Sequence, residues 1–185
     1  EKEMLSNVAA MKADGTVSKI IVLINSANAL QVDFLKDNTY NVDACLWIGD
    51  VGITGINAVA DILAGNVNPS GSLVDTYCYD NMSSPAMANF TPVTYEGYTE
   101  ELVPEKAKSY MVYQEGIYVG YKYYETRYED TVMGTGNAGS YVYSDDVAFP
   151  FGYGLSYTDF EYSDMTGVYD AATDSYNFNV TVTNT

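Results

Sequence analysis

The chain has 185 residues, of which 47% are hydrophobic, and its 8 basic against 25 acidic side chains give a formal net charge of −17. This length allows one domain with a sizeable core and part of a second. The negative charge excludes nucleic acid and anionic membrane surfaces as expected partners, because both are bound through positive side chains.

Helical and strand patterns alternate along the first part of the chain. Helices are predicted over residues 1–15, 29–38 and 54–65, where apolar residues recur at helical spacing. Strands are predicted over residues 19–25, a short and continuously apolar run as in strands covered on both faces, and over residues 42–49, another candidate for a buried strand. Such alternation is typical of a parallel sheet joined by right-handed crossovers. The sequence therefore predicts an α/β fold with a mostly parallel sheet.

The ends and the buried face of the predicted helices follow from particular residues. Gly15 and Gly65 are expected to end the first and third helices, because glycine readily adopts the left-handed conformation found there. Thr54 is the expected N-cap of the third helix. The residues of that helix expected to face inward are Ile56, Val59, Ala60 and Leu63.

The patterns are weaker in the middle of the chain. A turn at residues 68–71 leads into another short strand. Residues 80–110 lose periodicity and carry three of the five prolines, which predicts a long surface connection. Residues 113–130 fit a strand and a helix equally well, because their apolar positions both alternate and share a helical face.

The last part of the chain is typical of β-structure. Residues 158–170 and 176–185 are rich in aromatic and β-branched side chains and are separated by a polar turn. Two strands alone are marginally stable in water. We therefore expect them to open a β-sandwich that continues past Thr185.

The aromatic and glycine-rich segment 149–163 is expected to mark a domain junction, where rings fill a seam and glycines let the backbone bend. The predicted domains are residues 1–157 and residues 158–185. The first residues show neither a signal-peptide pattern nor a membrane-spanning pattern and already follow a helical pattern, so we expect more of the first domain upstream of Glu1.

Four motifs follow one another along the chain in an order typical of a known family. They are KIIVLINSANAL, LWIGDVGITGINAVADILAGNVNPSGSLVDTY, YQEGIYVGYKYYE and FPFGYGLSYTDFEYS. In this order they resemble glycoside hydrolase family 3, the β-glucosidase and β-xylosidase group, over residues 19–77, 113–125 and 148–185. The final VTVTNT is similar to the second strand of that family's fibronectin type III-like domain. The resemblance implies a three-layer α/β-sandwich domain followed by the start of a fibronectin type III-like domain.

The resemblance also implies an activity for the parent protein. Family members hydrolyse terminal β-linked glucose or similar sugars with retention, using an aspartate nucleophile on a (β/α)₈ barrel and usually a glutamate acid/base. The nucleophile motif places Asp before Trp, whereas the single Trp47 here follows Leu46, and the acid/base is expected upstream of residue 19. Retaining cleavage needs two carboxyl groups about 5–5.5 Å apart. We therefore expect this chain alone to be inactive. The expected partners are a catalytic barrel domain outside the chain and a β-linked oligosaccharide or glycoside.

The chain departs from the family pattern in two places. IGDVGI stands where PGQEGG is usual, and Val74 stands at an expected proline. These differences bear on loop shape and substrate preference more than on the fold.

No catalytic residue, metal ligand or cofactor is predicted within the chain. It contains no histidine, which excludes His-based triads, general bases and zinc sites. Cys45 and Cys78 form no metal-binding motif, and Cys45 lies in an apolar run that favours a buried thiol. Neither the compartment nor the redox state of the cysteines is assigned.

A candidate substrate-binding site comes from the position of polar residues after the predicted strands. Asn25 and Ser26 follow the first strand, and Asp50 follows the second. Because ligands of open α/β sheets bind beyond the carboxyl ends of the strands, we hypothesise that these residues face the barrel and border its sugar cleft. The alternative is that they only cap loops.

A second function remains open for the whole chain. The 19 tyrosines could serve a carbohydrate-binding or interaction module that has no catalytic role.

Overall fold

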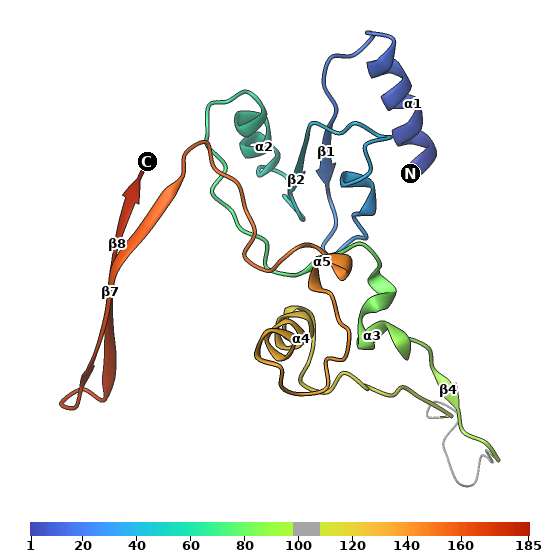
Figure 1. Ribbon diagram of the computed structural model, residues 1–185. Helices are drawn as coiled ribbons and strands as arrows, with labels where there is room; N and C mark the ends of the chain where they lie inside the picture. The colour runs from blue at the N-terminus through green and yellow to red at the C-terminus, as the bar shows by residue number, and fades with distance from the viewer. Residues whose placement is uncertain (98–107) are drawn as a thin grey trace. The chain divides into compact units, whose positions relative to one another are not determined.

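A computed structural model describes residues 1–97 and 108–185 (Figure 1). The helices are α1 (Lys2–Ala13), α2 (Ile56–Leu63), α3 (Pro85–Ala88), α4 (Tyr121–Met133) and α5 (Tyr143–Asp146), with 3₁₀ turns η1 (Asp33–Leu35) and η2 (Asn81–Ser83). The strands are β1 (Ile21–Ile24), β2 (Ala44–Trp47), β3 (Tyr77–Cys78), β4 (Val93–Thr94), β5 (Ser109–Tyr110), β6 (Val147–Phe149), β7 (Phe160–Asp170) and β8 (Ser175–Asn184).

The chain divides into two compact units. The first unit comprises Glu1–Thr54 and Ser72–Tyr153, and the second comprises Gly55–Gly71 and Gly154–Thr185. The predicted domain boundary at residues 157 and 158 stays a prediction.

The strands of the described residues pair two by two. β1 and β2 are parallel, whereas β3–β6, β4–β5 and β7–β8 are antiparallel. The predicted mostly parallel sheet is therefore not seen in the part of the chain that the structure describes. The physical reason is connectivity: a parallel pair needs a crossover between its strands, and the chain between β1 and β2 provides one, whereas the later strands meet through hairpins or long returns.

β1 confirms the predicted strand but not its double coverage. Val22 and Ile24 pack into the core, whereas Ile21 and Leu23 are 47% and 38% exposed. Neighbouring residues of a strand point to opposite faces, so the run of apolar side chains divides between a covered and an uncovered face.

The core of the first unit consists of two clusters, one on each face of the β3–β6 ladder. The Val32 cluster contains Ile24, Val32, Tyr77 and Ala148, and the Tyr124 cluster contains Cys78, Tyr124 and Val147. Tyr77 is opposite Phe149 and Cys78 is opposite Val147, with Ala148 as the extra residue of a bulge. Because successive strand residues alternate in direction, adjacent residues serve different clusters.

The first and third predicted helices form, as α1 and α2, whereas the second, over residues 29–38, is reduced to one turn. α1 ends as expected at Gly15, which has a φ of 83° and donates its N–H to the Lys12 carbonyl. The predicted helix over 29–38 is only η1, because the Val32 backbone is non-helical and its N–H donates to the Cys78 carbonyl at 3.3 Å. Here a tertiary hydrogen bond and full burial of Val32 override the helical spacing.

α2 confirms the third predicted helix, with two corrections. Its N-cap is Gly55 rather than Thr54, and no side chain caps it. Of the four residues expected to face inward, Val59 is buried. Ile56, Ala60 and Leu63 are exposed in the part of the chain that the structure describes. Gly65 has a φ of 77° and follows the helix end, as expected.

The predicted surface connection of residues 80–110 contains short elements. The Asp80 side chain accepts the Met82 N–H at 2.8 Å to begin η2, and the Ser84 hydroxyl accepts the Ala86 N–H to cap α3. β4 and β5 then pair as a ribbon. Residues 98–107 lie outside the described residues.

Residues 113–130, whose pattern fitted a strand and a helix equally well, are helical from Tyr121 onward, within α4. The helix begins at Tyr121, and Gly134 ends it in the left-handed conformation. Tyr124 is buried in the Tyr124 cluster, and its hydroxyl shares a 2.9 Å hydrogen bond with Ser83.

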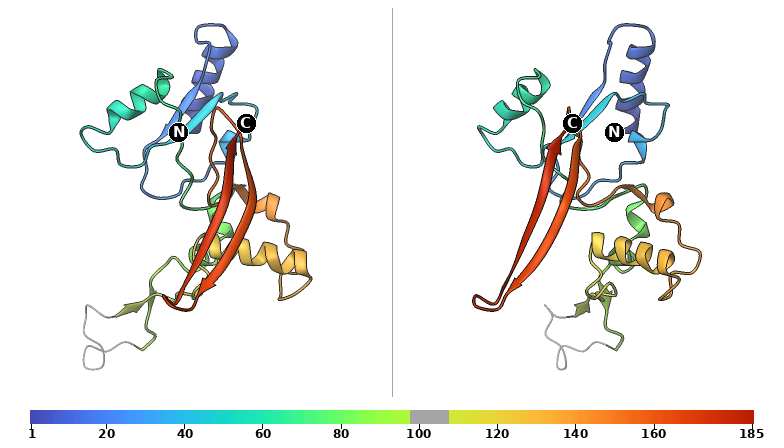
Figure 2. Two further views of the ribbon diagram at one scale, coloured as in Figure 1. Left: turned by 90° about the vertical axis from the view of Figure 1, so that its left-hand side faces the viewer. Right: turned by 60° about the vertical axis from the view of Figure 1, so that its left-hand side comes forward.

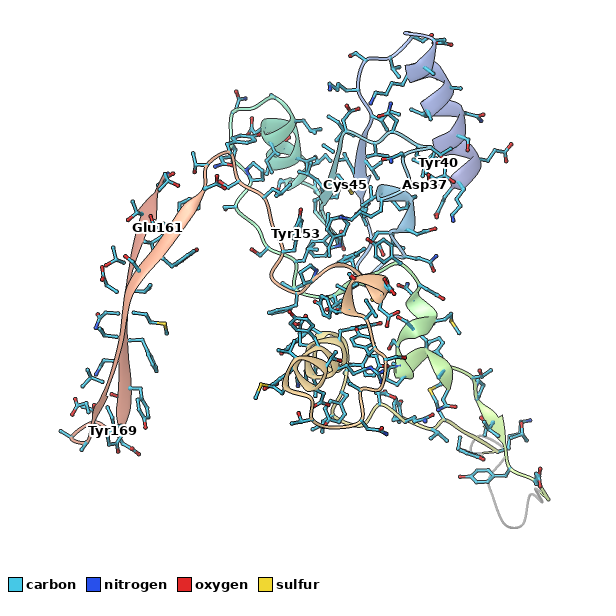
Figure 3. All side chains as sticks on the ribbon, in the orientation of Figure 1. Asp37, Tyr40, Cys45, Tyr153, Glu161 and Tyr169 are labelled. Atoms are coloured by element: carbon cyan, nitrogen blue, oxygen red, sulfur yellow. The ribbon has the colours of Figure 1, made fainter. Side chains whose placement is uncertain are left out.

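The aromatic segment near residue 150 packs within the first unit as far as Tyr153. Gly152, with a φ of 80°, occupies a turn closed by the Tyr153 N–H and the Pro150 carbonyl. Two backbone hydrogen bonds join this turn to Leu73: the Gly152 N–H donates at 2.7 Å and the Leu73 N–H donates to the Tyr153 carbonyl at 2.8 Å. The Phe151 ring stacks on Tyr121 with centroids 4.3 Å apart. Figure 3 labels Tyr153, the last residue of this turn.

β7 and β8 form a long antiparallel hairpin, which confirms the two predicted strands (Figures 1 and 2). One face carries apolar side chains and the other carries mainly polar ones, as the register requires. The apolar face consists of Phe160, Tyr162, Met165, Tyr169, Tyr176, Phe178, Val180 and Val182, all of them exposed. Phe178 lies over Gly167, where an added Cβ would be 2.8 Å from the ring.

Candidate functional site

The predicted site residues lie at the carboxyl edge of the β1–β2 pair. Ile24 is opposite Trp47, so the two parallel strands end at the same level. The Ile48 N–H donates to the Ile24 carbonyl at 2.9 Å, which extends the ladder by one step. Asn25 and Ser26 therefore follow β1, and Asp50 follows β2, at one edge of the sheet.

Each of the two loops at this edge is closed by local hydrogen bonds. The Ser26 hydroxyl donates to the Asn28 carbonyl at 2.8 Å and accepts the Asn28 N–H at 3.2 Å. One Asp50 carboxylate oxygen accepts the Gly52 N–H at 3.3 Å. Asn25 and Asp50 are exposed, and Ser26 is half-buried. These contacts fit loop capping, and the exposed Asn25 and Asp50 side chains carry further hydrogen-bonding groups.

Trp47 joins the two loops, a feature that the sequence analysis missed. Its indole N–H donates to the Ser26 carbonyl at 2.9 Å. Its ring also borders Gly49, where an added Cβ would lie 3.1 Å from Cζ2 of the indole. Between Asp50 and either Asn25 or Ser26, the described residues show no direct hydrogen bond. The signal in the sequence was a tryptophan at the end of a predicted buried strand, because a partly buried indole N–H requires an acceptor. The structure leaves Ala44 and Trp47 of β2 exposed, so the double coverage predicted for this strand is not seen either.

Charged side chains stabilise the opposite edge of the β1–β2 pair, where the two strands begin. Asp43 accepts from Lys12 Nζ at 2.6 Å, from Lys19 Nζ at 3.0 Å and from the Ile20 N–H at 2.7 Å. The hydrogen bond from the Lys12 ammonium, followed by those from Ile20 and Lys19, holds the pKa of the Asp43 carboxyl well below its usual range. This cluster ties the end of α1 to both strands and lies away from the candidate site.

The thiols are structural. Cys45 on β2 (Figure 3) is half-buried, and burial raises its pKa to about 11, so the thiol stays protonated at neutral pH. Cys78 is buried in the Tyr124 cluster, and burial also raises its pKa. The sequence favoured a buried thiol at Cys45, and the structure finds it half-buried.

A second group of titratable side chains joins α4 to α5. The Tyr143 hydroxyl donates to Glu125 at 2.5 Å, and burial together with this bond raises the Tyr143 pKa. The Arg127 guanidinium lies 4.6 Å from the centre of the Tyr141 ring and donates to the Ala138 carbonyl. Burial raises the pKa of Asp146 above its ordinary value, although the nearby Arg127 charge acts in the opposite direction. These contacts hold the segment after α4 in place.

Within residues 1–97 and 108–185, no three histidine, cysteine or acidic side chains are arranged to hold a metal ion. None of the described helices has the length and apolarity to span a bilayer.

The geometry defines a mixed α/β chain with hydrogen-bonding side chains at the carboxyl edge of a parallel pair. Residues 1–121 match the family model described as "Glycosyl hydrolase family 3 C-terminal domain". A β-glucosidase from Ruminococcus albus is 32% identical over 152 residues, which are 82% of this chain and 13% of that protein. An exo-α-(1→6)-L-arabinopyranosidase from Bifidobacterium breve is 31% identical over 184 residues, which are 98% of this chain and 19% of that protein. The solved structure of β-glucosidase 3B from Thermotoga neapolitana in complex with α-D-glucose aligns with a TM-score of 0.66 at 30% identity, over 99% of this chain and 21% of that chain.

The chain therefore belongs to glycosyl hydrolase family 3 and corresponds to its C-terminal domain. The resemblance carried by the four motifs is confirmed. The chain spans 13% and 19% of the length of the two curated relatives named above.

Proposed function

We propose that the chain is part of a retaining glycoside hydrolase that acts on terminal β-linked glucose or similar sugars, and that it supplies the domain that completes the active-site cleft. The observation that carries this proposal is the family match over residues 1–121. Relatives named β-glucosidase support a glucoside as substrate, and the arabinopyranosidase relative supports a wider range of sugars.

The proposed division of labour follows from the chemistry. Retaining cleavage uses a nucleophilic carboxylate and an acid/base carboxyl about 5–5.5 Å apart. We place both on segments outside these 185 residues, the nucleophile on a barrel domain. The Asn25 amide, the Ser26 loop and the Asp50 carboxylate would hydrogen-bond sugar hydroxyls at the edge of the cleft and orient the substrate for attack.

The proposed domains are residues 1–157, as a three-layer α/β sandwich, and residues 158–185, as the start of a fibronectin type III-like domain. The uncovered face of β1 supports the first assignment, because a further layer would bury Ile21 and Leu23. The apolar face of the β7–β8 hairpin supports the second, because a β-sandwich buries one face of each sheet.

The test of this function is hydrolysis of aryl glycosides by the full-length protein that contains the chain and by the 185-residue chain alone. We expect the longer protein to cleave aryl β-glucosides with retention of configuration, measured by proton NMR of the released sugar, and the chain alone to cleave none. Aryl α-L-arabinopyranosides test the wider sugar range. Cleavage by the 185 residues alone would show that the catalytic carboxylates lie within them.

Replacing Asp50 by alanine tests the role of the carboxyl edge. We expect kcat/KM of the full-length protein on aryl β-glucosides to fall by about 10-fold, because a hydrogen bond from a sugar hydroxyl to a carboxylate is lost. Asp37→Ala is the matched control, since Asp37 accepts the N–H two residues on in the same way, at 2.8 Å from Thr39, in the loop before β2 (Figure 3). Equal kcat/KM values for the two variants would mean that Asp50 only caps its loop and does not bind substrate.

A carbohydrate-binding or interaction module remains the second candidate, favoured by the exposure of tyrosine rings such as Tyr113, which is 74% exposed. Exposed rings can stack on sugars. Glycan binding by a full-length protein that cleaves no glycoside would favour this function over the first.

A further inference from the structure

We infer that Trp47 is a positioning residue of the carboxyl edge: its indole sets the spacing between the loop that carries Asn25 and Ser26 and the loop that carries Asp50. This inference rests on the proposed function, because the spacing matters for a sugar bound at that edge. It assigns to Trp47 a role in substrate preference rather than in bond cleavage.

The first support is the way in which Trp47 is held. As the last residue of β2, opposite Ile24, it stands where both loops leave the sheet. Its N–H donates to the Ser26 carbonyl at 2.9 Å, a contact across 21 residues of sequence. The remaining contacts of the Ser26 and Asp50 side chains reach only two residues along the chain. Within the part of the chain that the structure describes, the indole thus links by its side chain two loops whose own side-chain hydrogen bonds are local.

The second support is the shape of the loop after β2. Gly49 is buried and has a φ of 56°, in the left-handed region that favours glycine. A Cβ there would lie 3.1 Å and 3.2 Å from two carbons of the Trp47 ring. The backbone therefore lies directly against the indole, and moving the ring would move the segment that leads to Asp50.

The third support is the partial exposure of Trp47, at 38%. A tryptophan that served only the core would be expected to bury its ring, as Val32 and Tyr124 are buried in their clusters. The indole N–H, the single donor of the Trp47 side chain, instead donates to a loop carbonyl at the edge, and part of the ring lies at the surface.

The test is Trp47→Phe in the full-length protein, which removes the N–H donor and keeps an aromatic ring. On a panel of aryl glycosides we expect KM to rise roughly 3- to 10-fold, as expected for loss of one hydrogen bond that shapes a site, with kcat within about twofold of wild type. Val32→Ala is the control for a purely structural loss, since Val32 is fully buried in the same unit. It should lower the melting temperature and leave KM unchanged.

Hydrogen–deuterium exchange supplies a readout besides activity. Trp47→Phe should speed exchange in peptides covering residues 25–28 and 48–52, whereas Val32→Ala should speed it around the Val32 and Cys78 hydrogen bond. Unchanged exchange in both loops, or a loss of kcat that follows the melting temperature with KM unchanged, would overturn the role of Trp47. A wild-type protein that cleaves none of the glycosides would overturn the proposed function and the substrate role together, and the exchange result would still show whether Trp47 holds the loops.

Discussion

Replacing Val32 by aspartate should unfold the first unit under conditions in which the wild-type chain is folded. Val32 has no exposed surface and packs with Ile24, Tyr77 and Ala148. An ionised carboxylate there would have no partner, so we expect a loss of about 4 kcal/mol or more, against a total stability of about 5–15 kcal/mol for a typical domain. Urea denaturation followed by circular dichroism measures this change as a shift of the midpoint.

The matched control for this substitution is Val74→Asp. Val74 lies in the same unit and is 70% exposed, so its replacement should change stability by less than about 0.5 kcal/mol. Equal denaturation midpoints for Val32→Asp and Val74→Asp would mean that the Val32 cluster is not the core of this unit.

Replacing Asp43 by asparagine should lower the melting temperature at neutral pH by several degrees, the second large effect. The carboxylate accepts three hydrogen bonds, from Lys12, Lys19 and Ile20, and its side chain is only 20% exposed. A neutral amide loses the attraction to both ammonium groups, and its oxygen alone remains as an acceptor. The link from α1 to the β1–β2 pair is thereby weakened.

The Asp43 effect should depend on pH in a defined direction. The pKa of Asp43 is lowered in the folded chain from its ordinary value of 3.8, so the folded state binds this proton less readily than the unfolded state. Its stabilisation is therefore complete above about pH 5 and is lost as the pH falls through the unfolded value toward the folded one. The gap in melting temperature between wild type and Asp43→Asn should narrow below about pH 4.

An exposed carboxylate provides the control for the pH series. Asp159→Asn changes the same charge in the second unit, at a residue whose hydrogen bonds use its backbone carbonyl. It should leave the melting temperature close to wild type at every pH. A constant gap between wild type and Asp43→Asn from neutral to acid pH would contradict the ionic origin of the Asp43 contribution.

Much of the fold could be predicted where one pattern was strong. The apolar runs predicted β1 and β2, Gly15 and Gly65 predicted two helix ends, and the β7–β8 hairpin followed from aromatic and β-branched residues around a polar turn. Each of these signals is local, so a short window of sequence contains it. The position of Asn25, Ser26 and Asp50 at one edge also followed, because parallel strands end together.

The parts that failed depend on contacts between distant residues. Residues 29–38 have helical spacing, yet Val32 donates its N–H to Cys78 and only η1 remains helical. Trp47 was interpreted only by its sequence neighbours, although its partner is the Ser26 carbonyl. No periodicity within either segment contains this information.

The sequence by itself determined the types of the strongly patterned elements, the lack of histidine chemistry and the family, because each is written in neighbouring residues or in motifs that survive in order. The tertiary structure alone decided that β3 pairs with β6 across some seventy residues, that one face of β1 stays uncovered, and that Asp43 and Trp47 brace opposite edges of the same strand pair. Pairing and burial are set by the free energy of the whole chain, in which a distant acceptor or an apolar cluster outweighs the few tenths of a kcal/mol per residue that local preference contributes.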